Sequence, residues 1–322
     1  MISAFLTLSL ASLALGQVNV PSGFTPGVKW QIEIQTPISP SGTLLPSDTL
    51  VWDIDLYHAA ADPRIIPYIR SQIPGAIVIC YFNASLVQPS DCDYNSIWAH
   101  SGLLGSRHPD PGFEEESFID VRNPRAVDFI GNRITLAARI GCDGVDPDNI
   151  DTYHYDENGT NLKNAPELTA NVSSSLDFAV LENCAAYRQP DRDTEPFCAA
   201  YQDAYSRAGK PVLSIEYPPT LGSPTTGACN TRGVTQADYG GTCGSLLTAD
   251  KDGFSTVLKI QGGIGELNGC TQYCGAGVGR EVVVTRTEEG EEECPGPYTT
   301  PAVVEAAAAA AAGGVKVGGR RS

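Results

Sequence analysis

Short apolar runs rich in β-branched residues alternate with longer amphipathic stretches between Leu50 and Ile260. Such alternation predicts a parallel β-sheet whose strands are joined by crossover helices. Eight runs of this kind fit the size and strand count of a (β/α)8 barrel of the TIM type, an α/β fold. The predicted strands are Val51–Leu56, Ala76–Phe82, Ser117–Val121, Gly144–Pro147, Asn161–Asn164, Phe178–Glu182, Val212–Glu216 and Thr256–Ile260.

Two of the predicted helices have clear signals at their ends. The first is expected from Pro124 to about Gly141, because Asn123 is a suitable N-cap and glycine commonly ends a helix. The second is expected to end at Gly209. Their apolar faces, which we expect to pack on the barrel, are Val127, Ile130, Ile134 and Ala137 in the first helix and Phe197, Tyr201, Ala204 and Ala208 in the second.

The connection between the fourth and fifth predicted strands is short for this pattern. Only the polar segment NIDTYHYDENGT, residues 149–160, separates Asp148 from Asn161, and it has no apolar helical stripe. A parallel crossover needs about a dozen residues or more and usually contains a helix. The sequence therefore predicts a barrel that is incomplete between strands four and five.

The two ends of the chain differ in composition from the predicted barrel. Residues 1–16 contain a short apolar run that ends in small residues, which is typical of a secretory signal peptide. We expect an N-terminal extension at 17–29 and the barrel domain at 30–274. Residues 275–322 include an acidic run and an alanine run without a coherent pattern, so we expect a disordered tail. Because of the predicted signal peptide, we expect the chain to be secreted.

The chain is strongly acidic, with 38 Asp and Glu residues, 21 Lys and Arg residues and a formal net charge of −17. This charge repels nucleic acid and anionic membranes, so neither is an expected partner. It would attract a cationic ligand, although solubility alone also accounts for it. The ten cysteines include no C-x-x-C pair. In a secreted chain they predict disulfides, whose pairing the sequence leaves open.

Polar residues, most of them carboxylates, end nearly every predicted strand. In a (β/α)8 barrel the catalytic groups lie at these carboxyl ends. Glycoside hydrolysis needs at least two carboxylates, because one donates a proton to the leaving oxygen and the other acts as nucleophile or as base for water. The strand-end candidates are Asp53, Asp55, Tyr81, Asp120, Arg122, Asp146, Asp148, Lys163, Asn164, Glu182, Glu216 and Tyr217. For Asp120 and Arg122 a structural ion pair explains the pattern at least as well.

Other chemistries fit the sequence less well. The acidic segment DGVDPDNID, residues 143–151, departs from the EF-hand calcium loop, because counting from Asp146 places Ile150 fifth and Asp151 sixth. A serine nucleophile elbow of the G-x-S-x-G type is absent from the sequence. The four histidines lack metal-ligand spacing. We therefore expect neither a metal nor a cofactor.

The strand-end motifs resemble those of glycoside hydrolase family 114. They are VWDIDLYH, VICYFNAS, FIDVRNP, GCDGVDPDNID, LKN, FAVLENC, IEY and FSTVLKI, spread over about Trp30 to Cys274. The resemblance implies a (β/α)8 barrel with endo-α-1,4-polygalactosaminidase activity. Its substrate class would be a partly N-acetylated galactosamine polymer, which is cationic, and the acidic balance of this chain fits such a partner.

The family's acidic pair maps onto Asp148 and Glu182. The resemblance implies Asp148 as nucleophile or stabilising carboxylate and Glu182 as general acid/base, with the remaining strand-end residues as substrate or supporting groups. We expect a monomer. Two alternatives stay open: a barrel that binds a cationic glycan without cleaving it, and a related hydrolase of another sugar polymer.

One departure from the family pattern coincides with the short connection. Members of the family carry a helix and the start of the fifth strand between the fourth-strand motif and LKN, and this chain lacks them. The loss would leave an apolar flank and a strand edge uncovered. We therefore expect this chain to be less stable than one that carries the helix.

Overall fold

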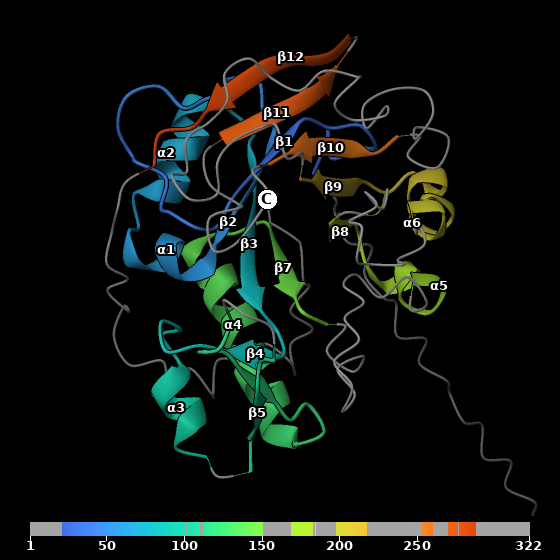
Figure 1. The fold of residues 1–322 in the computed structure, drawn as a ribbon. Helices are drawn as coiled ribbons and strands as arrows, with labels where there is room; N and C mark the ends of the chain where they lie inside the picture. The colour runs from blue at the N-terminus through green and yellow to red at the C-terminus, as the bar shows by residue number, and fades with distance from the viewer. Residues whose placement is uncertain are drawn as a thin grey trace, which may run out of the picture.

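The computed structural model describes residues 21–100, 102–109, 113–150, 169–182, 184, 198–217, 253–259, 270–275 and 277–287. These residues form two sheets of mainly parallel strands, flanked by helices, and one small antiparallel sheet (Figure 1). The first sheet has the order β1 (Trp30–Glu33), β2 (Val51–Asp55), β3 (Ile77–Asn83) and β7 (Gly144–Asp148), all parallel. The second joins β8 (Ala179–Glu182), β9 (Val212–Glu216) and β10 (Ser255–Leu258) in parallel and adds β11 (Cys270–Gly275) and β12 (Gly277–Val284) in antiparallel orientation.

Side-chain hydrogen bonds join β1 to β10, the facing strands of the two large sheets. The indole Nε1 of Trp30 donates to the carbonyl oxygen of Ser255 at 2.8 Å. Just beyond the end of β10, the Nζ of Lys259 donates to the carbonyl oxygen of Ile32 at 2.6 Å. Both donors are fully buried. These contacts place β1 next to β10, so the parallel strands follow one another in the order β7, β3, β2, β1, β10, β9 and β8, as in a (β/α)8 barrel.

The predicted third barrel strand occupies a different place. Residues Ser117–Ile119 do form a strand, β6, but it pairs antiparallel with β4 (Leu86–Val87) and β5 (Leu104–Arg107). β3 instead pairs directly with β7, so the expectation that this run is a barrel strand is wrong. The short strand β1, which was not predicted, supplies a barrel strand next to β2. The predicted strand Asn161–Asn164 lies outside the described residues.

Alternation along the strands separates an inner core from an outer one. Val51, Ile77 and Leu213 belong to the cluster enclosed by the two large sheets, whereas Trp52 and Val78 pack against the helices. This two-sided burial explains why β2 and β3 read as nearly continuous apolar runs. The interior therefore holds a packed apolar layer, on which the strand-end polar groups rest.

The helices cover the two large sheets from separate sides (Figure 1). On the side of the first sheet lie α1 (Leu56–Ala61), α2 (Ile65–Gln72) and α4 (Pro124–Ile140), and on the side of the second lie α5 (Thr169–Val172) and α6 (Cys198–Ala204). The short helix α3 (Tyr94–Trp98) accompanies the antiparallel sheet. Short 3-10 turns follow α5 at Ser173–Ser175 and α6 at Ser206–Ala208. In the described part of the chain, no helix is long and apolar enough to span a membrane.

Helix α4 begins and ends where the sequence predicts. The Asn123 side chain accepts a hydrogen bond from the Arg125 backbone N–H, and Gly141 ends the helix with φ 101°. The predicted apolar face is wrong at Val127, whose side chain is 65% exposed. Arg133 is buried in its stead, at 3% exposure. The buried face of α4 therefore includes the charged residue Arg133, which a search for apolar residues at helical spacing does not find.

Arg133 joins α4 to the segment before α3 through a buried ion network. Its guanidinium donates to both carboxylate oxygens of Asp93, at 2.8 and 2.7 Å, and to Asp91 at 3.3 Å. It also donates to the carbonyl oxygen of Asn83, the last residue of β3. The Tyr57 hydroxyl of α1 donates to Asp93 at 3.2 Å. The network therefore fixes the carboxyl end of β3 against two helices.

The second predicted helix is confirmed in part, because α6 ends at Ala204 and Ala208, which was expected to be buried, is exposed in the following 3-10 turn. Tyr201 of α6 is buried, and Gly209 closes the following turn with φ 78°. Phe197 lies outside the described residues. Disulfides join Cys80 to Cys142 and Cys184 to Cys198. The first ties β3 to the segment that enters β7, and the second ties the end of β8 to α6.

Part of the segment that was expected to be a disordered tail is structured. Residues Gly277–Val284 form β12, which pairs with β11. Thr285 follows it, is 2% exposed, and donates through its hydroxyl to the carbonyl oxygen of Leu45 at 2.6 Å. Hydrophobic periodicity missed this strand because its β-branched run is only three residues long. Residues 288–322 lie outside the described part of the chain.

Candidate active site

Six of the predicted site residues lie together in the barrel interior, and strand register gives the levels of those in the first sheet. Tyr81 of β3 pairs with Asp55 of β2 and with Asp146 of β7, so these three lie at one level. Asp148 lies one level above, opposite Asn83. Asp53 lies one level below Asp55, on the inner face with Val51. The residues grouped around the barrel interior are Asp53, Tyr81, Asp146, Asp148, Glu182 and Tyr217.

Asp148 is held by donors on both of its carboxylate oxygens. The Tyr81 hydroxyl donates to Oδ2 at 2.8 Å, and the backbone N–H of Asn149 donates to Oδ1 at 2.7 Å. Asn149 adopts a left-handed backbone conformation with φ 58°, which asparagine tolerates better than most residues. This conformation turns its N–H back toward the carboxylate. Donors of this kind favour the ionised carboxylate, as a nucleophile or stabilising group requires.

Glu182 is held in a matching way by the neighbouring strand. The Tyr217 hydroxyl, directly after β9, donates to Oε1 of Glu182 at 2.6 Å. Tyr217 is itself 4% exposed and belongs to the inner apolar cluster. A buried tyrosine therefore sets the position of one carboxylate oxygen.

Asp53 and Asp146 form a second carboxyl pair beneath the first. Burial, together with Asp146 and then Asp148 and Asp55, raises the pKa of Asp53 well above its usual value. Burial and the Asp148 carboxylate raise the pKa of Asp146 to about 8, and Glu182 adds to the effect. Burial and the nearby Asp148 carboxylate also raise the pKa of the Tyr81 hydroxyl, so it stays a donor. Burial and the neighbouring carboxylates thus favour the protonated forms of Asp53 and Asp146, which lie beneath Asp148.

Three predicted site residues have structural contacts elsewhere. Asp55 caps α1, accepting hydrogen bonds from the backbone N–H groups of Tyr57 and His58 at 2.8 and 2.9 Å. Asp120 and Arg122 form an ion pair of 2.7 Å beyond β6, and the Arg122 side chain is 88% exposed. The Arg122 guanidinium lowers the pKa of Asp120. This pair belongs to the antiparallel sheet and is not part of the carboxylate group.

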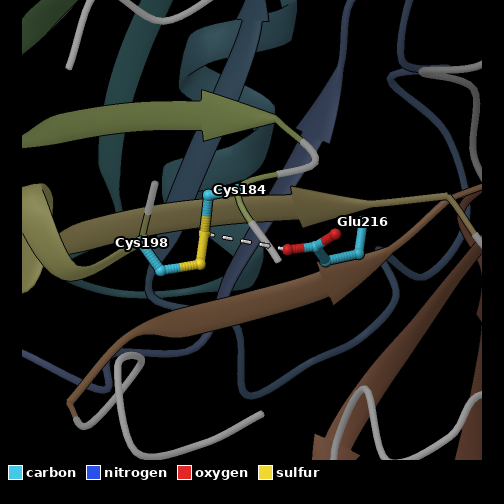
Figure 2. Close-up of side chains that lie close together, drawn as sticks. All are labelled: Cys184, Cys198 and Glu216. Atoms are coloured by element: carbon cyan, nitrogen blue, oxygen red, sulfur yellow. Dashed lines mark hydrogen bonds between the residues drawn. A yellow bond between two sulfur atoms is a disulfide. The ribbon is translucent and has the colours of Figure 1, made fainter. Parts of the chain in front are cut away.

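The structure also separates Glu216 from the site, although Tyr217 next to it is inside. Glu216 is fully buried on the opposite face of β9, where its Oε1 lies 3.9 Å from the Sγ of Cys184 (Figure 2). The Cys184 and Cys198 sulfurs and this carboxylate lie within 4.8 Å of one another. Because the sulfurs form a disulfide, they offer no thiolate to a metal. Glu216 therefore packs against the disulfide, and the prediction that it contacts substrate is not supported.

The remaining predicted site residues, Lys163 and Asn164, lie outside the described residues, so their role stays a prediction. Sequence reasoning missed Asn149, which positions Asp148 through its backbone. An asparagine directly after a strand-end aspartate is a signal for a left-handed turn.

Comparison with known proteins identifies a family. The model of glycoside-hydrolase family GH114 matches residues 14–162 and 159–279. The two matched segments meet at the connection that is short for a barrel crossover. No curated protein sequence matches the chain.

Solved structures are similar to the chain over most of its length. The crystal structure of Aspergillus fumigatus Ega3 in complex with galactosamine is 26% identical, with a TM-score of 0.61, and covers 80% of this chain and 100% of that one. The glycoside hydrolase domain of PelA from Pseudomonas aeruginosa is 16% identical, with a TM-score of 0.46, over 74% of this chain and 96% of that one. Because the family model matches most of its residues, the chain belongs to glycoside-hydrolase family GH114, the family of endo-α-1,4-polygalactosaminidases.

Proposed function

We propose that this chain is a secreted endo-acting glycosidase that cleaves α-1,4-linked polymers of galactosamine and N-acetylgalactosamine. The observation that carries the proposal is the pair Asp148 and Glu182, each held by a tyrosine hydroxyl at the carboxyl end of a parallel strand. Family membership and the likeness to Ega3, which was crystallised with galactosamine, support the choice of sugar. The disulfides agree with an oxidising compartment.

In this proposal Asp148 acts as nucleophile or as the carboxylate that stabilises the oxocarbenium-like transition state. Its two donors, Tyr81 and the Asn149 N–H, keep it ionised. Glu182 donates the proton to the leaving oxygen and then serves as base toward water. The acidic group around the pair attracts the ammonium groups of the polymer.

The proposal is tested by oligosaccharide release from a partly deacetylated galactosamine polymer. Asp148→Asn and Glu182→Gln are expected to lower the rate by at least about 10³-fold while leaving the fold intact by circular dichroism. Asp120→Asn serves as the matched control, because it removes a strand-end carboxylate that lies outside the group. Near-normal activity of both site variants would show that the assignment is wrong.

A second candidate function is binding of a cationic glycan without cleavage. The family match supports considering this second function, because the match is divided into two segments that overlap at residues 159–162. Sedimentation of the wild-type protein with the polymer, with no release of oligosaccharides, would support this second function. Release from a different sugar polymer in the same panel would instead indicate a related hydrolase.

A further inference from the structure

A small lobe between β3 and α4 exposes a tryptophan. This insert lobe, residues 84–123, consists of α3 and the antiparallel sheet of β4, β5 and β6. Trp98, the last residue of α3, is 54% exposed, whereas Trp30 and Trp52, the other two tryptophans of the chain, are fully buried. An indole in water leaves a large apolar surface uncovered, so Trp98 is a candidate contact for a ligand.

Trp98 is held in a fixed orientation. Its ring stacks on that of Tyr94, with 5.6 Å between the ring centroids and 26° between the planes. The two residues are four positions apart, so α3 itself brings their rings together. Tyr94 packs in turn on the apolar core of the insert lobe, beside Ile97 and Leu103. The indole is therefore supported by protein on one side and open to solvent elsewhere, as in a stacking platform.

The insert lobe is joined to the end of the barrel at which Asp148 lies. Arg133 donates both to Asp93, the residue before α3, and to the carbonyl oxygen of Asn83, the last residue of β3. Asn83 lies opposite Asp148 in the strand register, and the N–H of Ala84 donates to the carbonyl oxygen of Asp148 at 2.8 Å. In Figure 1 α3, β4 and β5 lie together at one end of the molecule, and β12 lies at the other. A polymer bound at the carboxylates could therefore extend over this lobe.

The insert lobe combines aromatic rings with negative charge. A second exposed ring, Phe113, is 37% exposed and contacts the His108 imidazole, with 5.2 Å between the centroids. The two residues that follow it, Glu114 and Glu115, are exposed. Residues 84–123 contain seven Asp and Glu residues, two arginines and no lysine. Carboxylates attract ammonium groups, and an indole face binds both a cation and the apolar face of a sugar ring. The chemistry of the lobe therefore fits a cationic sugar chain.

We propose that the insert lobe is a second binding site for the galactosamine polymer, in which Trp98 stacks on a sugar unit that lies outside the Asp148–Glu182 pair. This inference rests on the proposed function and adds a subsite for the same substrate. Glu114 and Glu115 attract the ammonium groups of the chain as it crosses the lobe. Because one sugar unit occupies one site only, the lobe increases the affinity for a polymer that spans both sites and takes no part in bond cleavage.

Acrylamide quenching of tryptophan fluorescence tests the contact directly. Because Trp30 and Trp52 are buried, the quenchable emission comes from Trp98. In Glu182→Gln, which is expected to bind without cleaving, a saturating amount of partly deacetylated galactosamine polymer should lower the quenching constant by about twofold or more, since a stacked sugar covers a face of the indole. Polylysine, which is cationic but has no sugar ring, is expected to leave the constant unchanged. Equal protection by polylysine would show that charge alone covers Trp98 and would overturn the proposal.

Substitution of Trp98 provides a kinetic readout. Trp98→Ala is expected to raise the KM for the polymer roughly 5- to 30-fold, with kcat within about twofold of wild type, because it removes one stacking contact that is equally strong before and during cleavage. Trp98→Phe keeps a ring and should restore most of the affinity. Val284→Ala removes an exposed apolar side chain from β12 and is the matched control. The affinity for galactosamine itself should be the same in all three variants, and thermal unfolding verifies that each is folded.

The outcomes separate this second site from the proposed function. If the wild type cleaves the polymer but Trp98 stays unprotected, or if Trp98→Ala has the wild-type KM, the second site is refuted and the proposed function stands. If the polymer protects Trp98 but the wild type never cleaves it, the second site stands and the proposed cleavage is refuted. A protein that does not bind the polymer at all would refute both.

Discussion

The Tyr217 hydroxyl lies 2.6 Å from Oε1 of Glu182 and donates a hydrogen bond to it, just as the Tyr81 hydroxyl does to Asp148 at 2.8 Å. The two tyrosines come from different sheets, yet each is the inward-facing residue near the end of a strand adjacent to the one that carries its carboxylate. Each of the two carboxylates, one in each large sheet, is therefore positioned in the same way by a tyrosine of the adjacent strand.

Removal of either hydroxyl should impair catalysis more than folding. Hydrogen bonds to charged groups contribute about 1.5–3 kcal/mol, so Tyr217→Phe and Tyr81→Phe are expected to lower kcat by roughly 10- to 100-fold. Initial rates of oligosaccharide release and thermal unfolding check the two quantities together. Tyr68→Phe is the control, because the Tyr68 hydroxyl donates to the exposed backbone carbonyls of Ser41 and Gly42, away from the candidate site. A kcat within twofold of wild type for both site variants would contradict the assigned positioning role.

Arg133 should contribute strongly to stability. Arg133→Met leaves the buried carboxylates of Asp91 and Asp93 without their cation, which costs about 3–5 kcal/mol in such networks. Urea unfolding measures this change. Arg122→Met removes an exposed ion pair and is expected to change the free energy of unfolding far less than Arg133→Met does. Similar free energies of unfolding for the two variants would show that the buried network does not fix α4 to β3.

Stability should fall as the pH rises toward neutrality because of Glu33. Burial raises the pKa of Glu33 from 4.5 to about 7, against the opposing effects of Lys259 and Thr285. Between these two values the folded state binds more protons than the unfolded state, so this contribution is complete below about pH 4.5 and is lost as the pH passes 7. Glu33→Gln cannot ionise, so its unfolding free energy is expected to vary less over that range. Parallel curves for variant and wild type would refute this linkage.

The short connection after Asp148 is expected to lower the stability and the activity of the chain, and a longer connection is expected to restore both. Insertion of an amphipathic helical segment after Gly159 is expected to raise both the melting temperature and the rate of polymer cleavage, because it would cover the apolar flank that the sequence leaves open. An insertion of equal length made of glycine and serine separates the effect of a helix from that of a longer loop. Equal stability and activity for all three chains would argue that nothing is missing.

Part of the candidate site could be read from the sequence because local signals define it. Apolar runs of β-branched residues marked β2, β3, β7, β8 and β9, and the polar residues at their carboxyl ends then supplied Asp53, Tyr81, Asp146, Asp148 and Glu182 as candidates. The same signals failed for β1 and β6. Strand β1 has the sequence WQIE, which lacks an apolar β-branched run, and β6 has the composition of a barrel strand but pairs elsewhere. Composition predicts a strand, whereas its partner depends on contacts far apart in the chain.

The sequence by itself determined the family, the strand-end carboxylates and the limits of α4, because motifs, alternation and capping residues act over a few neighbouring positions. Only the tertiary structure decided which polar residues meet. Tyr217 faces Glu182 inside the barrel while Glu216 packs against the Cys184–Cys198 disulfide, since adjacent residues of a strand point to opposite faces. The pairing of Asp53 with Asp146 also needed the structure, because β3 separates their strands in the sheet and 93 positions separate them in the sequence.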